Sequence, residues 1–592
     1  MSMTDQLKAI PFSTGLNEVV SDLNAKASDI RRSLNYSRQA EGGYEWIGGL
    51  AKWSGRDITR DLSSITAIEV SLVSTNLGLL SAEQLSSVEF QYLSFVVRQN
   101  SVIHFVQKNR STDMFQKLTY LDTGFQLLDD NPVLTDAEIE QGQDGIFGEP
   151  RVLNIQPTGD GDIKLLHENA GFLYAVRDSG SDSIVQRSLP NSGWRTIGTI
   201  PGAASDSARW EAYAYTFAGQ PPTLFIVNGV TEAWSAEYVA AGDPPLAVID
   251  DGVTQYPTHV IVHQNHLFLS FSGGRILHSN LGDPNNFTAL GGAAELSAGD
   301  EITGFQILPG DSLGIFCEDR IRILQGTSAA DWGLQDYSDE AGAIAGTIQN
   351  MPTSIFADKR GITTLASSDA YGSFKDKTLT QQTDPTFQSI RRNAILFSSV
   401  NRAKSQYRLI NQDGRGLYLT FNGSSLVGIM EIDLGLPITA MGTLRGSNDQ
   451  VYVASGGWVY QMDYPSALYD HEVEAFIELV DHHYGNPRQK KRFSQVNLDI
   501  VGDPRTVLTV ANLIDGGQDF YEDNVPVDFN NLSRSGERYR EDLLSRYSQR
   551  FEGTAYLCGS GVSQSIRITN KSKHAHSIKS AVVHYRSRGQ KR

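Results

Sequence analysis

Seven segments between Phe172 and Tyr460 repeat one pattern: an apolar, β-rich run, a turn of Gly, Asn, Asp or Ser, and a second short apolar run. A four-stranded propeller blade takes roughly 40 to 50 residues, and successive runs start at about that interval. Such a unit buries its two faces only against neighbours, so we expect the segments to close into a ring around a central channel. The alternative fold is a large irregular β-sandwich. The runs open at Phe172, Leu224, Leu267, Leu313, Ile362, Leu417 and Val451.

The length and the cysteine content narrow the class of protein. A chain of 592 residues is far longer than one hydrophobic core needs and predicts about three domains. Cys317 and Cys558 are the only cysteines, so we expect no disulfide framework and folding in a reducing cytoplasm. The first residues lack the basic start and the apolar run of a secretory signal, and no stretch of about 18 apolar residues occurs. We therefore expect neither an export signal nor a membrane-spanning segment.

The charge is acidic and unevenly distributed. The formal net charge is −18, which is the opposite of what a protein that grips nucleic acid phosphates needs. From Ser466 onward, 18 basic and 16 acidic residues leave a net charge of +2, so residues 1–465 carry a net charge of −20. The chain ends in the basic run YRSRGQKR, which could contact phosphate or an acidic subunit or could simply be solvated.

Four regions follow from the residue pattern. In residues 1–60, apolar residues between Val19 and Leu34 at helical spacing predict a short helix. After it, a tight turn at Gly42 and Gly43 should dock this segment on the repeats. In residues 61–150, strand-like runs at 90–97 and 102–106 predict either an eighth blade or an inserted domain. Residues 151–465 form the propeller-like domain of seven or eight blades, and residues 466–592 form an antiparallel β-sandwich with a basic tail.

Within the last repeat, Gly456 and Gly457 lie between two apolar runs and predict a two-residue hairpin loop. Trp458 and Tyr460 would then point to one face of the returning strand, and we expect that face to be core.

Catalytic motifs are missing from the sequence. It contains no P-loop, GxSxG, HExxH or paired CxxC motif. The close histidine pairs are His482 with His483 and His574 with His576, and neither has a short-range carboxylate or thiol that would complete a metal site. Residues 188–194 resemble a sialidase turn but lack its aspartate. We expect Asp283, Asp300 and Asp319 to stabilise turns rather than to act as paired glycosidase acids. We therefore predict no catalytic, cofactor-binding or metal-binding residues.

Four motifs follow one another along the chain. Near the start lies DLNAKASDIRRSLNYSRQAEGGYEWIGGLAKWSG. In the middle, a strand is followed by Ser279, Gly282, Asp283, Pro284 and Phe287, and the hairpins QYRLINQDGRGLYLTF and GGWVYQMDY and the basic closing run SIKSAVVHYRSRGQKR come after it. In their residues and their order, these motifs together resemble the tail nozzle, or tail tubular hub, proteins of short-tailed bacteriophages. Residues 61–150 and 530–550 do not align with the family pattern.

The resemblance implies a non-enzymatic structural protein of the virion tail, assembled in the host bacterial cytoplasm. Such proteins form a hexameric ring below the portal and adaptor rings, conduct the genome during ejection and anchor fibres or spikes. The excess of acid in residues 1–465 permits a conduit that does not bind the passing DNA, since a basic wall would hold the phosphates. The alternative is a propeller-type glycan-binding protein or glycoside hydrolase.

Overall fold

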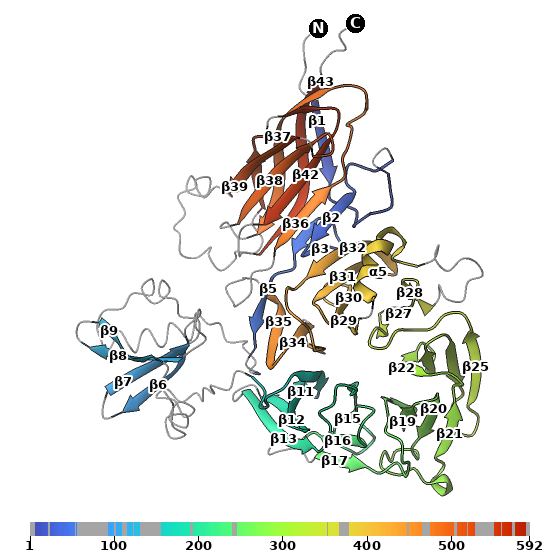
Figure 1. Ribbon diagram of the computed structural model, residues 1–592. Coiled ribbons are helices and arrows are strands. Elements are labelled where there is room, and N and C mark those ends of the chain that lie inside the picture. Colours follow the sequence, from blue (N-terminus) through green and yellow to red (C-terminus); the bar gives the residue numbers. More distant parts are fainter. Residues whose placement is uncertain are drawn as a thin grey trace.

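The computed structural model shows a mainly β protein (Figure 1). This confirms the predicted class. The structure describes residues 6–21, 24–53, 55, 93–99, 102–108, 115–121, 124–130, 156–189, 193–239, 246–351, 353–365, 378–392, 394–446, 449–464, 474–502, 506–517, 519–526, 550–557, 559–570 and 575–587.

Seven small antiparallel sheets follow one another along the chain, and their strands lie in sequence order except that β5 completes the last sheet. Sheet 1 contains β10 (Ile163–Asn169), β11 (Phe172–Ser179), β12 (Asp182–Leu189) and β13 (Gly193–Ile200). Sheet 2 contains β14 (Glu211–Tyr215), β15 (Thr223–Val227), β16 (Ala233–Glu237) and β17 (Leu246–Ile249). Sheet 3 contains β18 (His259–His263), β19 (His266–Phe271), β20 (Arg275–His278) and β21 (Ala294–Ser297), with the 3-10 helix η1 (Ala289–Gly291) before β21.

The remaining sheets continue the series with two variations. Sheet 4 contains β22 (Ile302–Leu308), β23 (Ser312–Cys317), β24 (Ile321–Gln325) and β25 (Gly333–Ser338). Sheet 5 has three strands, β26 (Gln349–Asn350), β27 (Ser354–Ala357) and β28 (Ile362–Thr364), and is followed by η3 (Gln381–Thr383) and α5 (Asp384–Arg391). Sheet 6 contains β29 (Leu396–Asn401), β30 (Gln406–Asn411), β31 (Arg415–Asn422) and β32 (Ser425–Asp433). Sheet 7 contains β33 (Ala440–Leu444), β34 (Gln450–Ser455), β35 (Trp458–Tyr464) and β5 (Gly49–Lys52).

Each of the seven apolar runs found in the sequence lies on a different sheet. Five of them lie on the second strand of their sheet, as Phe172 does on β11. The runs at Ile362 and Leu417 lie on the third strand, β28 and β31. This difference is one reason for the uneven spacing of the runs along the chain.

Apolar cores join every sheet to the next. One cluster of buried residues lies between each consecutive pair of sheets, from Leu224 against Val176 for sheets 1 and 2 to Ile410 against Val453 for sheets 6 and 7. A further cluster, with Leu173 and Tyr452, joins sheet 7 to sheet 1. The first strands β10 and β33 are also in contact. The seven sheets therefore surround a common centre, as Figure 1 shows.

The last sheet combines strands from distant parts of the chain. Strand β5 pairs with β35, with Lys52 opposite Tyr460 and Gly49 opposite Tyr464. The predicted two-residue loop at Gly456 and Gly457 is confirmed, because Ser455 pairs directly with Trp458. Tyr460 is buried and Trp458 is half-buried, and both pack on the core between sheets 6 and 7.

The remaining strands form a separate part, which we call the two-sheet domain. One of its sheets contains β1 (Gln6–Pro11), β3 (Tyr36–Arg38), β4 (Tyr44–Trp46), β37 (Lys491–Gly502), β40 (Arg550–Ala555), β41 (Gly559–Gly561) and β43 (His576–Ser587). The other contains β2 (Ile30–Leu34), β36 (Ala475–Leu479), β38 (Val507–Ile514), β39 (Asp519–Pro526) and β42 (Gln564–Asn570). Residues of both sheets, such as Val496 and Ile568, are buried in one shared core.

The N-terminal segment differs from the sequence prediction. The short helix expected over residues 19–34 is wrong, because Ile30–Leu34 is the strand β2 and pairs with β36. Only β5 of this segment joins the ring of sheets, while β1 to β4 complete the two-sheet domain. The helical spacing of apolar residues gave a wrong prediction here, since buried positions of an edge strand are apolar as well.

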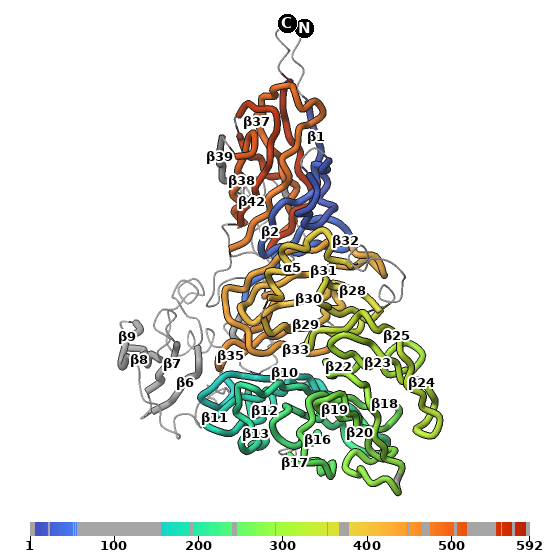
Figure 2. Tube along the Cα trace, turned by 45° about the vertical axis from the view of Figure 1, so that its right-hand side comes forward, coloured from blue at the N-terminus to red at the C-terminus, as the bar shows by residue number. Residues whose placement is uncertain are grey.

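The two parts meet at the outer strand of sheet 6. The amide of Leu16 donates to the carbonyl of Ile429 (2.8 Å), and the amide of Asp433 donates to Oδ1 of the buried Asn35 (2.8 Å). Met430 of β32 lies in the core of the two-sheet domain. The tube in Figure 2 shows the two-sheet domain extending from this side of the ring, with the start of β1 at its far end.

Residues 61–150 contribute one further sheet in the order β6 (Leu93–Gln99), β7 (Val102–Lys108), β8 (Phe115–Leu121) and β9 (Gly124–Asp130). The two strands predicted at 90–97 and 102–106 correspond to β6 and β7. In the chain this sheet lies between β5 and β10. Because sheets 7 and 1 already contact each other, the ring is complete without it.

Candidate functional site

Residues 188–194, which resemble a sialidase turn, have structural roles where the structure describes them. Oγ of Ser188 accepts a hydrogen bond from the amide of Leu173 (2.9 Å). Trp194 is buried and lies edge-on to Trp53, with 5.4 Å between the ring centroids. The contact helps to hold sheet 1 against the segment that follows β5.

The histidine pairs take part in packing. Nε2 of the buried His576 lies 2.8 Å from the hydroxyl of Tyr36, and its ring stacks on Trp46. Nδ1 of His482 accepts a hydrogen bond from the amide of Tyr484 (3.0 Å). His574, the other residue of this pair, lies outside the described residues. Among the residues that the structure describes, no group of three His, Cys, Asp or Glu side chains could hold a metal ion.

The three aspartates singled out from the sequence lie in turns. Oδ1 of Asp283 accepts the amide of Asn285 (3.2 Å). The carboxylate of Asp300 accepts the amides of Glu301 (2.9 Å) and Asp319 (3.1 Å). The exposed carboxylate of Asp319 forms an ion pair with Lys359 (2.6 Å). The residues stabilise turns, as predicted, and Asp300 also ties one sheet to the next.

The strand order separates the charges of the ring onto two rims. Successive antiparallel strands run in opposite directions, so successive loops lie at opposite rims of the ring. We use the name acidic rim for two sets of loops, those between the second and third strands of each sheet and those that lead into the first strand of each sheet. The α5 segment, which leads into sheet 6, is not included. The loops between first and second strands and between third and fourth strands form the opposite rim.

Acidic residues far outnumber basic ones on the acidic rim and not on the opposite rim. In the described loops, the acidic rim carries Asp160, Asp162, Asp206, Glu232, Asp250, Asp251, Asp300, Glu301, Glu318, Asp319, Asp339, Glu340, Asp358 and Asp413, against Arg209, Arg320, Lys359 and Arg360. The opposite rim carries Asp283, Asp311, Asp331 and Asp449, against Arg402, Lys404 and Arg445. The pKa of Asp251 is raised by burial and by the neighbouring carboxylates of Asp250 and Glu232. In the described loops of the ring, the excess of acidic residues therefore lies on one rim.

The centre of the ring has a different character. The first strands of neighbouring sheets contact one another there, and the half-buried Tyr213 and Phe305 on two of these strands pack on the core between sheets 3 and 4. Burial lowers the pKa of His167 on β10 to about 4, so this side chain adds no positive charge at neutral pH. On β18, His259 contacts Glu211 (2.6 Å); burial alone would lower its pKa, but the carboxylate outweighs burial and raises it.

Three buried histidines surround Trp332 at the opposite rim of sheets 3 and 4. The ring centroids of His263, His266 and His278 lie 6.0, 5.1 and 5.0 Å from that of Trp332. Nδ1 of His266 and Nδ1 of His278 both lie within 3.1 Å of the carbonyl of Ser279. Among the described residues, neither ring nitrogen of His263 has a hydrogen-bond partner. Burial lowers the pKa of His263 and of His278.

This cluster predicts a loss of stability in mild acid. With a lowered pKa in the folded state, His263 and His278 take up protons more readily in the unfolded chain, where the pKa is about 6.5. The melting temperature should therefore fall as the pH is lowered from 7.5 through 6.5 to 5. His263→Leu should make this fall shallower, because it removes one of the two histidines with a lowered pKa. Equal pH profiles for His263→Leu and the unmodified protein would contradict the prediction. The measurement is thermal unfolding followed by circular dichroism.

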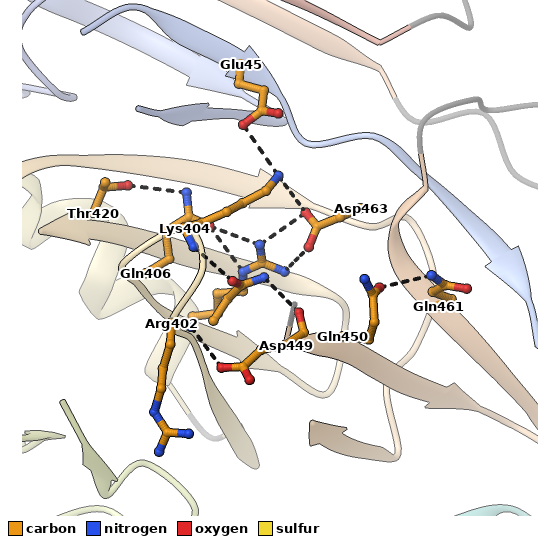
Figure 3. A network of polar contacts seen from close by, with 11 residues as sticks. Glu45, Arg402, Lys404, Gln406, Thr420, Asp449, Gln450, Gln461 and Asp463 are labelled. Atoms are coloured by element: carbon orange, nitrogen blue, oxygen red, sulfur yellow. Dashed lines mark hydrogen bonds and ion pairs between the residues drawn. The ribbon is translucent and has the colours of Figure 1, made fainter. Parts of the chain in front are cut away.

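A buried ionic network connects sheet 6, sheet 7 and the two-sheet domain. The guanidinium of Arg408 on β30, which is 0% exposed, donates to both carboxylate oxygens of Asp463 on β35 (2.7 and 3.1 Å). Nζ of Lys404 lies 3.4 Å from Asp463 and 3.4 Å from Glu45 of β4. Figure 3 shows Lys404 between these two carboxylates. The guanidinium also lies over the ring of Tyr418, 4.5 Å from its centroid.

The charges in this network stabilise one another. Burial alone would lower the pKa of Arg408, but the Asp463 carboxylate outweighs burial and raises it. Burial alone would raise the pKa of Asp463, and the cations of Arg408 and Lys404 lower it instead. The pair therefore stays ionised, and its partners lie on separate sheets. The sequence did not single out these residues, because nothing in their spacing of 55 positions indicates contact.

Comparisons with known proteins leave the family open. No family model and no curated protein sequence matches the chain. Among solved structures, Raptor from Chaetomium thermophilum is similar with a TM-score of 0.36 at 11% identity, over 54% of this chain and 28% of Raptor. The computationally designed protein Ika8 is similar with a TM-score of 0.31 at 12% identity, over 63% of this chain and 97% of that one. Such weak similarities carry no argument about function. In the described part of the chain, no helix has the length and apolar character that crossing a membrane requires.

Proposed function

We propose that this chain is a structural component of a bacteriophage tail, a nozzle subunit that forms a hexameric ring and conducts the genome during ejection. In this proposal the ring of seven sheets is a seven-bladed β-propeller and the two-sheet domain is a β-sandwich. The protein would be assembled in the host cytoplasm and would contact the portal and adaptor ring and the fibres or spikes of the tail. It would not act as an enzyme.

The observation that carries the proposal is the concentration of acid on one rim of the ring. A passing duplex is held back wherever its phosphates bind cations, and a wall of carboxylates offers few such sites. The first strands of neighbouring sheets contact one another around the centre of each ring, so we place the conduit between copies. Those parts of the acidic rims that face this space and are not covered by another copy would let DNA pass without specific contacts.

The arrangement of the family-like motifs also supports the proposal. The opening motif with Gly42 and Gly43 lies where the two-sheet domain is completed by the N-terminal strands. The motif from Ser279 to Phe287 forms a compact loop of sheet 3, in which the amide of Asn280 donates to the carbonyl of Asn286 (2.8 Å). Each motif therefore has a defined structural role.

The proposal is tested by mass and by DNA binding on the intact protein. Light scattering during gel filtration should give a particle near six times 65.0 kDa, and electron microscopy down its axis should show an open ring. Filter binding with duplex DNA at low and moderate salt should show no tight, salt-sensitive affinity. Deletion of residues 586–592 should remove any weak residual binding. A monomer that binds or cleaves host glycans would favour the alternative, and tight DNA binding that survives the deletion would refute a conduit.

A further inference from the structure

The far end of the two-sheet domain carries a group of exposed cations, which we call the basic tip. It consists of Arg488 and Lys490 in the loop before β37, Arg492 on β37, and Arg586 on β43. The strand register brings the two strand residues together, since Arg492 pairs with Arg586. Only the last of them belongs to the basic tail that the sequence indicated.

The loop of the basic tip is held in place by hydrogen bonds within the chain. Nζ of the buried Lys491 donates to the carbonyls of Asn486 (2.8 Å), Gln489 (2.9 Å) and Val562 (3.1 Å). These bonds fix the loop that presents Arg488 and Lys490 to solvent. A surface that is already ordered loses less conformational entropy when a partner binds.

Like charges lie side by side at the tip. Arg492 and Arg586 are directly opposite each other in the register of β37 and β43. Like charges that lie opposite each other in a sheet repel, so carboxylates placed over this pair would be attracted to both side chains. The nearby Asp515 is directed elsewhere, since Oδ1 accepts the amides of Val562 (2.7 Å) and Ser563 (3.0 Å).

The basic tip is a positive surface far from the carboxylates of the ring, although the net charge of the chain is −18. It lies at the end of the 12-residue strand β43, which spans about 40 Å at roughly 3.4 Å per residue. This length is several times the Debye length of about 8 Å at physiological ionic strength. The carboxylates of the ring are therefore screened from a partner at the tip.

We infer that the basic tip docks on the acidic rim of a second copy of this chain. The two surfaces have opposite charge and lie on different parts of the same molecule, so the contact is heterologous. Heterologous contacts generate a closed ring when the rotation that relates one copy to the next closes. The inference deepens the proposed function by assigning a contact between subunits, and it rests on that function only in requiring that copies associate.

A charge-swap experiment tests the contact on the full-length chain. The tip-reversed variant carries Arg488→Glu, Lys490→Glu and Arg492→Glu. The rim-reversed variant carries Glu318→Lys, Asp339→Lys and Glu340→Lys at exposed positions of sheets 4 and 5. Each variant alone should associate at least about tenfold more weakly than the unmodified protein, because like charges then face each other. An equimolar mixture should recover the assembly, since each tip then meets a rim of opposite charge. Light scattering measures the mass, and unfolding curves confirm that both variants fold.

The other results have distinct meanings. Normal assembly of either variant alone overturns the tip contact but leaves a ring built through another interface. An unmodified protein that stays monomeric at all concentrations overturns both the contact and the proposed nozzle. If the tip-reversed variant assembles normally but loses affinity for duplex DNA, the partner of the tip is nucleic acid and the inference is wrong.

Discussion

Asp463→Asn should lower the free energy of unfolding by about 3–5 kcal/mol, because it leaves the guanidinium of Arg408 buried without its carboxylate. Asparagine tolerates the positive φ of 59° at this position, so the substitution removes charge without adding backbone strain. Chemical denaturation followed by circular dichroism and tryptophan fluorescence measures the loss.

Two controls separate the buried charge from other effects. Lys404→Ala removes a partly exposed cation from the same network and should cost about 1 kcal/mol or less. The double variant Arg408→Leu with Asp463→Asn should recover much of the stability, because no unpaired charge remains. A single variant Asp463→Asn as stable as the unmodified protein would show that the ion pair makes no net contribution.

Gly43→Val should destabilise the two-sheet domain by about 3 kcal/mol or more. Gly43 has a φ of 91°, a region that β-branched residues avoid. A Cβ atom here would lie 2.8 Å from the carbonyl oxygen of Ile578 and 2.8 Å from Cδ of Lys579. Both atoms belong to β43, so the side chain would push the N-terminal strands away from the last strand of the domain.

Gly42→Val is the matched control for this substitution. Gly42 has a φ of 120°, but a Cβ atom there would meet nothing within 4 Å. It should therefore show only the cost of backbone strain, on the order of 1–2 kcal/mol. Equal melting temperatures for Gly43→Val and Gly42→Val would show that close packing on β43 does not matter. The turn itself was predicted, but its partner is the two-sheet domain and not the repeats.

The two substitutions probe links between parts that are far apart in the sequence. The segment from β1 to β5 completes the two-sheet domain and then supplies the fourth strand of sheet 7. The salt bridge between Lys404 and Glu45 and the burial of Met430 connect the same parts. We therefore expect damage at either place to affect both the ring and the domain attached to it.

The strands themselves could be predicted from the sequence because their signals are local. Alternating apolar residues and turn residues such as Gly456 and Gly457 determine where a strand begins, ends and reverses, whatever its partners are. For this reason each of the seven runs marks one sheet. The same local signal failed at residues 19–34, where apolar residues at helical spacing belong to a strand and its approach.

The sequence by itself therefore determined the class of fold, the positions of the seven apolar runs and the excess of acid, whereas the number of repeated sheets stayed between seven and eight. Only the tertiary structure decided which strands pair across long distances, such as β5 with β35 and β1 with β43. Backbone hydrogen bonds are the same for every residue type, so pairing depends on which arrangement buries all apolar faces at once. The pairing of the strands also decides where the charges lie. The strand order puts most carboxylates of the described ring loops on the acidic rim, and the register brings the cations of the basic tip to the far end of the two-sheet domain.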